Sequence, residues 1–197
     1  LENQVLAPME SFIALRPPVS SVALPLRHID QQALKTVLRA IAERGRLRAS
    51  YQSITRDEPQ WREISPHAFG HDGLRWHVRA FCHLRGGFRD FILGRLMAVE
   101  PAGASDIKAA DDVQWSAMVE LQLTAHPDLS ESQRQGVELD YGMENGQVAL
   151  MCRQAMLFYT LRSLNFEASG QPRPGLKQLC IANLDAIGHL LPRPGQD

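Results

Sequence analysis

The sequence predicts an α+β fold with an N-terminal helix, a small β-barrel and an α+β C-terminal part. Three observations lead to this prediction. Apolar residues recur at helical spacing within residues 31–44. Between residues 46 and 101 the period changes from 3.6 to 2, which is typical of short strands. After residues 102–116, which are rich in small and acidic residues, the two patterns occur together.

The N-terminal helix has clear signals at both ends. Asp30 occupies the N-cap position before QQALKTVLRAIAERG, and Gly45 is expected to stop the helix. One face is apolar and must pack against another element. Residues 1–28, with the pair Pro17-Pro18, are predicted to form an extended connector. The chain opens at Leu1 rather than at methionine, so we expect a segment upstream of it.

Residues 46–101 are predicted to form four or five short strands. RLRASYQSI and WREISPHAF alternate, and residues 74–84 and 88–99 are expected to form a hairpin that turns at Gly86-Gly87. Strands this short and this close favour a small, strongly bent β-barrel over an open sheet, because closure removes exposed edges. We therefore divide the chain into a connector (1–28), a helix with the barrel (29–101), a linker (102–116) and a C-terminal part (117–197).

The C-terminal part is predicted to mix strands and helices. VELQLTAHP is typical of a strand, and Ser130 with Gln133 forms a capping box for a helix near 131–140. A strand at 147–152, a helix at 153–164, a strand near 177–181 and a short helix after Asn183 follow.

Arginine is concentrated in the predicted barrel although the net charge of the chain is only -1. The stretch from Arg46 to Arg95 holds nine arginines, no lysine and five acidic residues. In the strand at 74–84, alternation places arginine, histidine and Phe81 on one face, opposite an apolar face expected in the core. Asp90 differs in parity from Arg89, so we do not expect it to neutralise this face. The face is therefore either solvated or paired with acids elsewhere, or it binds an anion such as phosphate.

Several classes of protein are not indicated. No GxSxG motif or glycine-rich phosphate loop occurs, and Cys82 and His83 point to opposite faces of a strand. The histidines lack metal-site spacing with a third ligand, and the three cysteines form no CxxC pair. No signal peptide or membrane-length apolar run is present. We expect a cytoplasmic protein with no catalytic site, metal or cofactor.

The barrel segment resembles a WYL domain, which implies an Sm-like or SH3-like β-barrel. The family is named for a Trp-Tyr-Leu signature that here reads Trp76-His77-Val78. The flanking motifs Tyr51-x-Ser53, Ser65-Pro66-His67, RWHVRA and RDFILGR resemble WYL regulators of the BrxR and CapW type, which are associated with bacterial anti-phage defence. VELQLTAHPDLSESQRQGVELDYGMENGQVALMCRQAMLFYTLRSLNFE is similar to their C-terminal extension, called WCX.

This resemblance implies a homodimeric transcriptional repressor that binds operator DNA through an N-terminal winged helix-turn-helix, which is missing from this chain. It also implies a basic pocket for a nucleotide or oligonucleotide effector. The matching positions are Tyr51, Ser53, His67, His77, Arg79, Arg89 and Arg95. His77 replaces the signature tyrosine, so the role of that hydroxyl does not transfer.

Three functional hypotheses remain open from the sequence. The first is a ligand-sensing and dimerisation region of a regulator, in which Arg79, Arg89 and Arg95 together clamp phosphate. The second is a module that binds single-stranded nucleic acid directly. The third is a dimerisation scaffold whose arginines are already neutralised by acids of the same fold.

Overall fold

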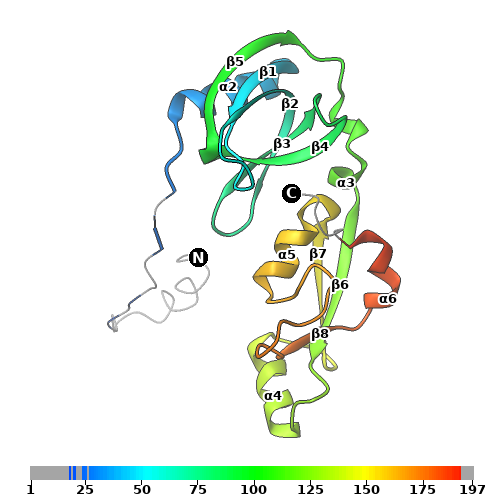
Figure 1. The fold of residues 1–197 in the computed structure, drawn as a ribbon. Coiled ribbons are helices and arrows are strands. Elements are labelled where there is room, and N and C mark those ends of the chain that lie inside the picture. Colours follow the sequence, from blue (N-terminus) through cyan, green and yellow to red (C-terminus); the bar gives the residue numbers. More distant parts are fainter. Residues whose placement is uncertain (1–17, 19, 21–23, 26, 192–197) are drawn as a thin grey trace.

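The computed structural model describes residues 18, 20, 24, 25 and 27–191. Figure 1 shows two units, one above the other, joined by a connecting segment that contains the short helix α3 (Val113–Ser116). The predicted connector at residues 1–28 lies almost wholly outside the described residues. The other elements confirm a mixed fold with two antiparallel sheets and several helices.

The helix α2 (Gln31–Glu43) confirms the predicted start but not the predicted stop. Asp30 accepts a hydrogen bond from the backbone N–H of Ala33 at 2.7 Å, as an N-cap residue should. The left-handed residue that ends the helix is Arg44, with φ of 53°, and Gly45 already begins the first strand. The buried face of α2 packs against the strands of the upper unit.

Five strands form the upper sheet, in the order β4-β3-β2-β1-β5. Their bounds are β1 (Gly45–Tyr51), β2 (Gln60–His71), β3 (Trp76–Cys82), β4 (Gly87–Ile92) and β5 (Leu96–Ala104). The register shifts in the β1–β5 pair and, near Pro66, in the β2–β3 pair. Such bulges bend a strand, and the sheet curves strongly (Figure 1).

The prediction of a closed barrel is wrong for the described residues, because no ladder joins β4 to β5. The 3₁₀ turn η1 (Leu93–Arg95) interrupts the strand predicted at 88–99 and leads the chain away from β4. A side chain links β1 to β4 instead: the backbone N–H of Ile92 donates to the Tyr51 hydroxyl at 3.3 Å. The upper unit is therefore a curved, open sheet.

The core of the upper unit lies between this sheet and α2. In β3, Val78, Ala80 and Cys82 are fully buried there, as the alternation predicts. The ends of the predicted apolar face are not buried. Trp76 is 46% exposed and packs against the ring of His71 at a centroid distance of 4.7 Å. Leu74 and Leu84, beyond the strand, are also exposed.

The lower unit is a three-stranded sheet in the order β7-β6-β8 with helices packed on it. Its elements are β6 (Met118–Ala125), α4 (Glu131–Asp140), β7 (Gln147–Arg153), η3 (Gln154–Met156), α5 (Leu157–Ser163), β8 (Leu179–Ile181), α6 (Leu184–Ile187) and η4 (Gly188–Leu190). The capping box of Ser130 and Gln133 starts α4 as predicted. The helix predicted at 153–164 begins only at Leu157, because the chain first makes the η3 turn.

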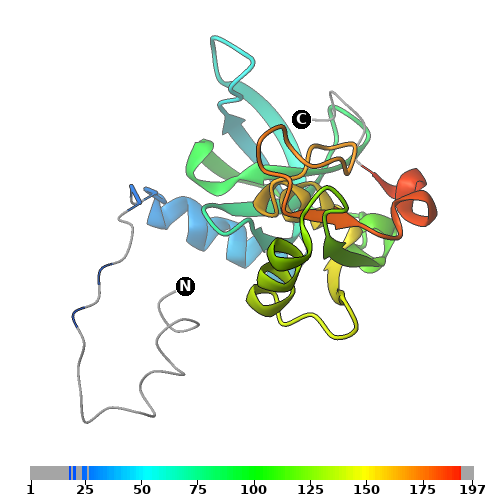
Figure 2. The same cartoon turned by 90° about the horizontal axis from the view of Figure 1, so that it is seen from below.

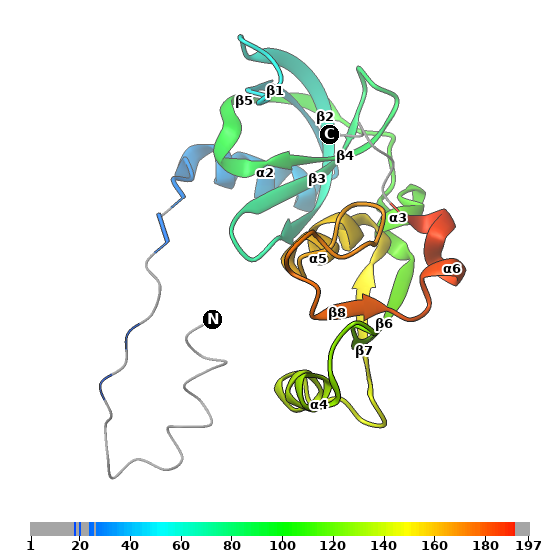
Figure 3. The same ribbon diagram turned by 60° about the horizontal axis from the view of Figure 1, so that its bottom comes forward.

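The lower unit has a separate core, which α5, α6 and the three strands share. Figure 2, seen from below, shows α4 and α6 on either side of β8. Figure 3 shows α5 at the end of the lower unit that faces the upper sheet. This position brings α5 against β3, where the candidate site lies. Within the described residues, no helix combines the length and the apolar character that crossing a membrane requires.

Candidate functional site at the junction of the two units

Two polar side chains of β3 are buried on the face opposite the upper core. His77 is 2% exposed and Arg79 is 3% exposed. Alternation turns them away from Val78 and Ala80, as predicted. They are not solvated, because the connecting segment and the lower unit cover this face. A buried charge needs partners within the protein.

Arg79 has these partners in two aspartates. Its Nε donates to Oδ2 of Asp112 at 2.7 Å and its Nη2 donates to Oδ1 at 3.0 Å, which is a bidentate pair. Nη2 also donates to Oε1 of Gln114 at 3.0 Å, and Nη1 donates to Oδ1 of Asp90 at 3.3 Å. Asp90 lies directly across the β3–β4 ladder from Arg79. The expectation that Asp90 does not neutralise this face is therefore wrong.

Asp112 is the centre of this cluster and only 1% exposed. It caps α3 by accepting from the backbone N–H of Trp115 at 3.1 Å. Its Oδ2 also lies 2.9 Å from Nε2 of His67. Burial acts to raise the pKa of the Asp112 carboxyl, but the hydrogen bonds and charge of Arg79, with the contact from His67, outweigh it and lower the pKa.

A second group extends the cluster into the lower unit. Nε2 of His77 lies 2.9 Å from Oδ2 of Asp72, and its Nδ1 lies 3.4 Å from the hydroxyl of Tyr159 in α5. The Tyr159 hydroxyl donates to Oδ2 of Asp90 at 3.3 Å. Polar contacts therefore run without a break from Asp72 to Arg79. We call the continuous set of Asp72, His77, Tyr159, Asp90, Arg79, Asp112 and His67 the junction network.

The aspartates of the junction network differ in their acidity. Burial acts to raise the pKa of Asp72, but hydrogen bonds from His77 and from the backbone N–H groups of Leu74 and Arg75 lower it to about 2. Burial raises the pKa of Asp90, although Arg79 acts in the opposite direction. The network thus combines firmly ionised carboxylates with one whose charge is disfavoured.

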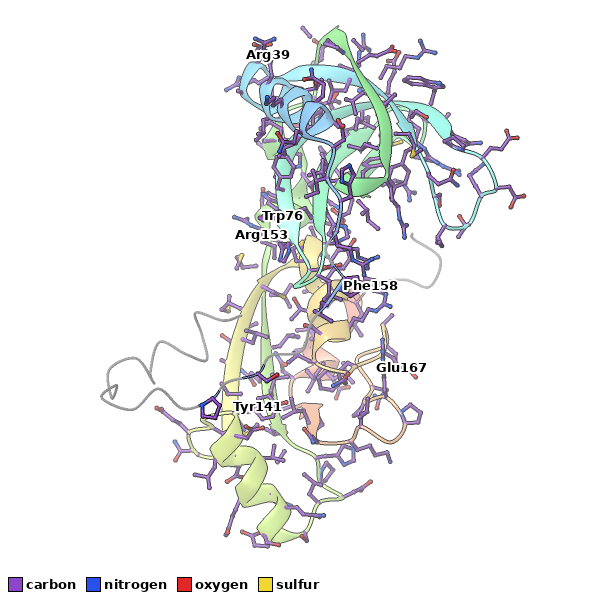
Figure 4. All side chains as sticks on the ribbon, turned by 90° about the vertical axis from the view of Figure 1, so that its left-hand side faces the viewer. Arg39, Trp76, Tyr141, Arg153, Phe158 and Glu167 are labelled. Atoms are coloured by element: carbon purple, nitrogen blue, oxygen red, sulfur yellow. The ribbon has the colours of Figure 1, made fainter. Side chains whose placement is uncertain are left out.

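A groove between the two units borders this network. It has a volume of about 510 Å³ and is lined from above by the end of β2 and its turn and from below by η3 and α5. Arg153 lies on the lower side, with its guanidinium 4.9 Å from the ring of Trp115. Figure 4 labels Trp76 and Arg153 at the level where the two units meet. The groove reaches Asp72 and Tyr159.

The other predicted ligand-binding residues lie elsewhere. Arg89 is opposite Ala80 in the β3–β4 register, so it shares the core side of the sheet and not the side of Arg79. Tyr51 packs edge-on against Phe91 at 5.1 Å. Gln52 donates its backbone N–H to the carbonyl of Arg95 at 3.1 Å, and the hydroxyl of Ser53 lies 2.9 Å from that of Thr55.

The seven predicted residues therefore divide into two sets. His67, His77 and Arg79 belong to the junction network, and Tyr51, Ser53, Arg89 and Arg95 do not. The expectation that Arg79 and Arg89 act as one clamp is wrong, because they occupy opposite faces of one sheet. Sequence reasoning missed Asp72, Asp112 and Tyr159. The one available signal was an aspartate at the N-cap of a short helix, within a segment interpreted as a linker.

Comparison with known families fits this architecture. Residues 32–101 match the WYL domain, and residues 118–187 match the BrxR transcriptional regulator C-terminal dimerization domain. The chain therefore contains a WYL domain followed by a BrxR-type C-terminal dimerization domain. The upper unit is the WYL unit and the lower unit is the dimerization-domain unit. The resemblance predicted from the motifs is confirmed.

Two curated relatives carry the name DNA-binding transcriptional repressor CapW. The protein from Stenotrophomonas maltophilia is 47% identical over 189 residues, which are 95% of this chain and 63% of that protein. The protein from Escherichia coli (strain KTE188) is 40% identical over 182 residues, 92% of this chain and 61% of that protein. The chain thus spans about three fifths of the length of these relatives. A solved structure, the proteasome accessory factor B/C of Arthrobacter aurescens, overlaps 66% of this chain and 22% of its own with 25% identity and a TM-score of 0.36.

Proposed function

We propose that this chain is the effector-sensing and dimerisation region of a DNA-binding transcriptional repressor. The two matched domains and the names of the relatives support this proposal. The relatives are repressors, which also agrees with the expectation that the chain is not an enzyme. In this proposal the chain forms a homodimer, and a winged helix-turn-helix outside it contacts the operator.

One observation carries the sensing part: the counter-ion of Arg79 comes from the segment that connects the two units. Asp112 caps α3 and at the same time neutralises Arg79 of the WYL unit. An effector with a phosphate group would compete with this carboxylate, since guanidinium groups bind both in the same bidentate manner. Displacement of Asp112 would release α3 and change how the two units are held together. The groove beside Asp72 and Tyr159 is where such an effector would begin to bind.

The same observation also favours a second candidate function. Arg79 is already neutralised by Asp112 and Asp90, which is what a dimerisation scaffold without a ligand requires. In that case the junction network only fixes the orientation of the two units. A buried ion pair is by itself weak support for ligand binding.

Thermal melting distinguishes these candidates. The chain is melted with cyclic nucleotides, short oligonucleotides and inorganic phosphate, and each shift is taken relative to the same variant without ligand. We expect one of the nucleotides or oligonucleotides to raise the melting temperature, and Arg79→Gln to abolish the shift while Arg95→Gln preserves it. No shift with any of them supports the scaffold. An oligonucleotide supports direct nucleic-acid binding if its affinity falls steeply with salt and a mononucleotide does not displace it.

A further inference from the structure

The strand β7 is only partly buried, through Val148 and Cys152, which pack against the lower core. None of its seven residues is fully buried, and β7 is an edge of the lower sheet. Met151 is 53% exposed and Leu150 is 37% exposed. Leu150 lies opposite the fully buried Leu121 of β6. An exposed apolar edge strand is a site for pairing with another strand.

The hydrogen-bond pattern shows which backbone groups of β7 point outward. Gln154 donates its N–H to the carbonyl of Ala117, next to the β6–β7 ladder. Bonding residues alternate along an antiparallel pair, so Cys152 and Leu150 also bond inward to β6. Gln147 has the opposite parity, and it indeed exchanges backbone bonds with Glu144 on the outer side. By the same alternation, Ala149, Met151 and Arg153 direct their N–H and C=O groups outward.

No backbone partner outside the helices and strands is found for the outward groups of Ala149 and Met151 among the described residues. The carbonyl of Arg153, the N-cap residue of η3, accepts the first hydrogen bond of that turn. The neighbouring surface is also apolar. Met118 is 52% exposed and lies diagonally across the ladder from Met151. The helix α4, which precedes β7, has no fully buried residue either. Val148 and Cys152 of β7 and Val137 of α4 pack, partly buried, against the lower core. The exposed apolar side chains of Met118, Leu150 and Met151 form a surface suited to contact with another protein.

We propose that β7 pairs antiparallel with β7 of a second copy of this chain, so that the two small sheets form one continuous sheet across a two-fold axis. A second copy is the occupant because residues 118–187, which include all of β7, match a dimerization domain. A two-fold axis also explains how one edge can be its own partner. This inference rests on the dimerisation part of the proposed function and adds the surface.

Charge and register agree with such pairing. An axis at Met151 pairs Met151 with Met151 of the second copy and lets Ala149 face Arg153. The Met151 pair then exchanges two backbone bonds and the N–H of Arg153 donates to the carbonyl of Ala149 in the second copy. No charge faces a like charge, which would be destabilising. The register stops before Gln147, whose outer side Glu144 already occupies.

The test measures the dissociation constant of the dimer by sedimentation for the full chain and its variants. Met151→Pro removes an outward N–H that the β6–β7 ladder does not use, and should raise the constant at least about tenfold. Met151→Ala keeps the N–H and should change it less. Met97→Lys alters another exposed residue on an edge strand, β5, and should leave the dimer intact.

The outcomes separate this inference from the proposed function. If Met151→Pro leaves the dissociation constant unchanged, or if Met97→Lys raises it as much, the β7 pairing is wrong but the dimer itself is confirmed. A chain that stays monomeric at every concentration overturns both. If Met151→Pro does not fold, hydrogen exchange of the unmodified chain decides: the amides of Met151 and Arg153 should gain protection as concentration rises, and equal exchange at all concentrations refutes the pairing.

Discussion

The substitution Asp112→Asn tests the Arg79–Asp112 ion pair of the junction network. The substitution keeps the size of the side chain and its ability to cap α3, but removes the charge that neutralises Arg79. Both partners are nearly inaccessible, with side chains 4% and 1% exposed for Arg79 and Asp112. Breaking a buried pair by removing one partner costs about 3–5 kcal/mol. Because Asp90 still lies 3.3 Å from the guanidinium, we expect the lower end, about 3 kcal/mol.

The assay is urea unfolding followed by circular dichroism. Asp111→Asn is the matched control, because Asp111 is exposed and accepts from the backbone N–H of Lys108 at 2.9 Å. We expect this variant to lose less than about 1 kcal/mol of stability. In a double-mutant cycle with Arg79→Gln, the two losses should fall short of additivity by at least about 1 kcal/mol. An Asp112→Asn variant as stable as Asp111→Asn, or additive losses, would refute the reasoning.

Three further predictions follow from the same contacts. The pKa of Asp72 is lowered from 3.8 to about 2, so its ionised form should stabilise the fold above about pH 4. This contribution, at most about 2 kcal/mol, should be lost as the pH falls towards 2. The urea midpoint of Asp72→Asn should therefore depend less on pH over this range, and parallel pH curves for the variant and the unmodified chain would contradict the prediction. Tyr159→Phe should lower the free energy of unfolding in urea by about 1 kcal/mol, whereas Tyr141→Phe, at the end of α4, should leave it unchanged. Equal losses of stability in the two variants would contradict a structural role of the Tyr159 hydroxyl in the junction network. Gly94→Ala should destabilise by about 1–3 kcal/mol in thermal melts, because an added Cβ would lie 2.6 Å from the carbonyl of His28; stability like that of Gly87→Ala, where no atom lies within 4 Å, would show that the backbone can yield.

The predictable parts of this fold are those set by neighbours in the sequence. Asp30 as a cap, Ser130 with Gln133, and the alternation of β3 are local patterns, and the structure confirms each. Burial at the ends of β3 depends on elements that are distant in the sequence. Trp76 alternates as a core residue but lies beyond the reach of the upper core, since the strand pattern does not tell where the opposing layer stops.

One part of the site was within reach of the sequence. In a hairpin with an even number of turn residues, an odd-numbered residue faces an even-numbered one. The structure pairs Arg79 with Asp90 through a four-residue turn, and a two-residue turn at Gly86-Gly87 gives the same parity. The parity of Asp90 was compared with that of Arg89, its neighbour in the same strand, instead of with that of Arg79 across the hairpin. Asp90 was for this reason wrongly excluded as the partner of Arg79. Asp112 and Tyr159, by contrast, come from separate elements, and only the packing of the two units brings them to β3.

The stability of the Arg79–Asp112 pair also sets how an effector can act. An effector that displaces Asp112 must replace the free energy of the pair through contacts of its own, because a ligand shifts an equilibrium only by its differential affinity. If the pair contributes about 3 kcal/mol, the unmodified chain binds the effector up to about 100-fold more weakly than a chain in which the pair is already broken. Asp112→Asn should therefore bind the phosphate-bearing compound that gives the largest thermal shift more tightly, although it folds less stably. Calorimetric titration of both chains well below their melting temperatures measures this, and equal or weaker binding by Asp112→Asn would mean that the effector does not compete with that carboxylate.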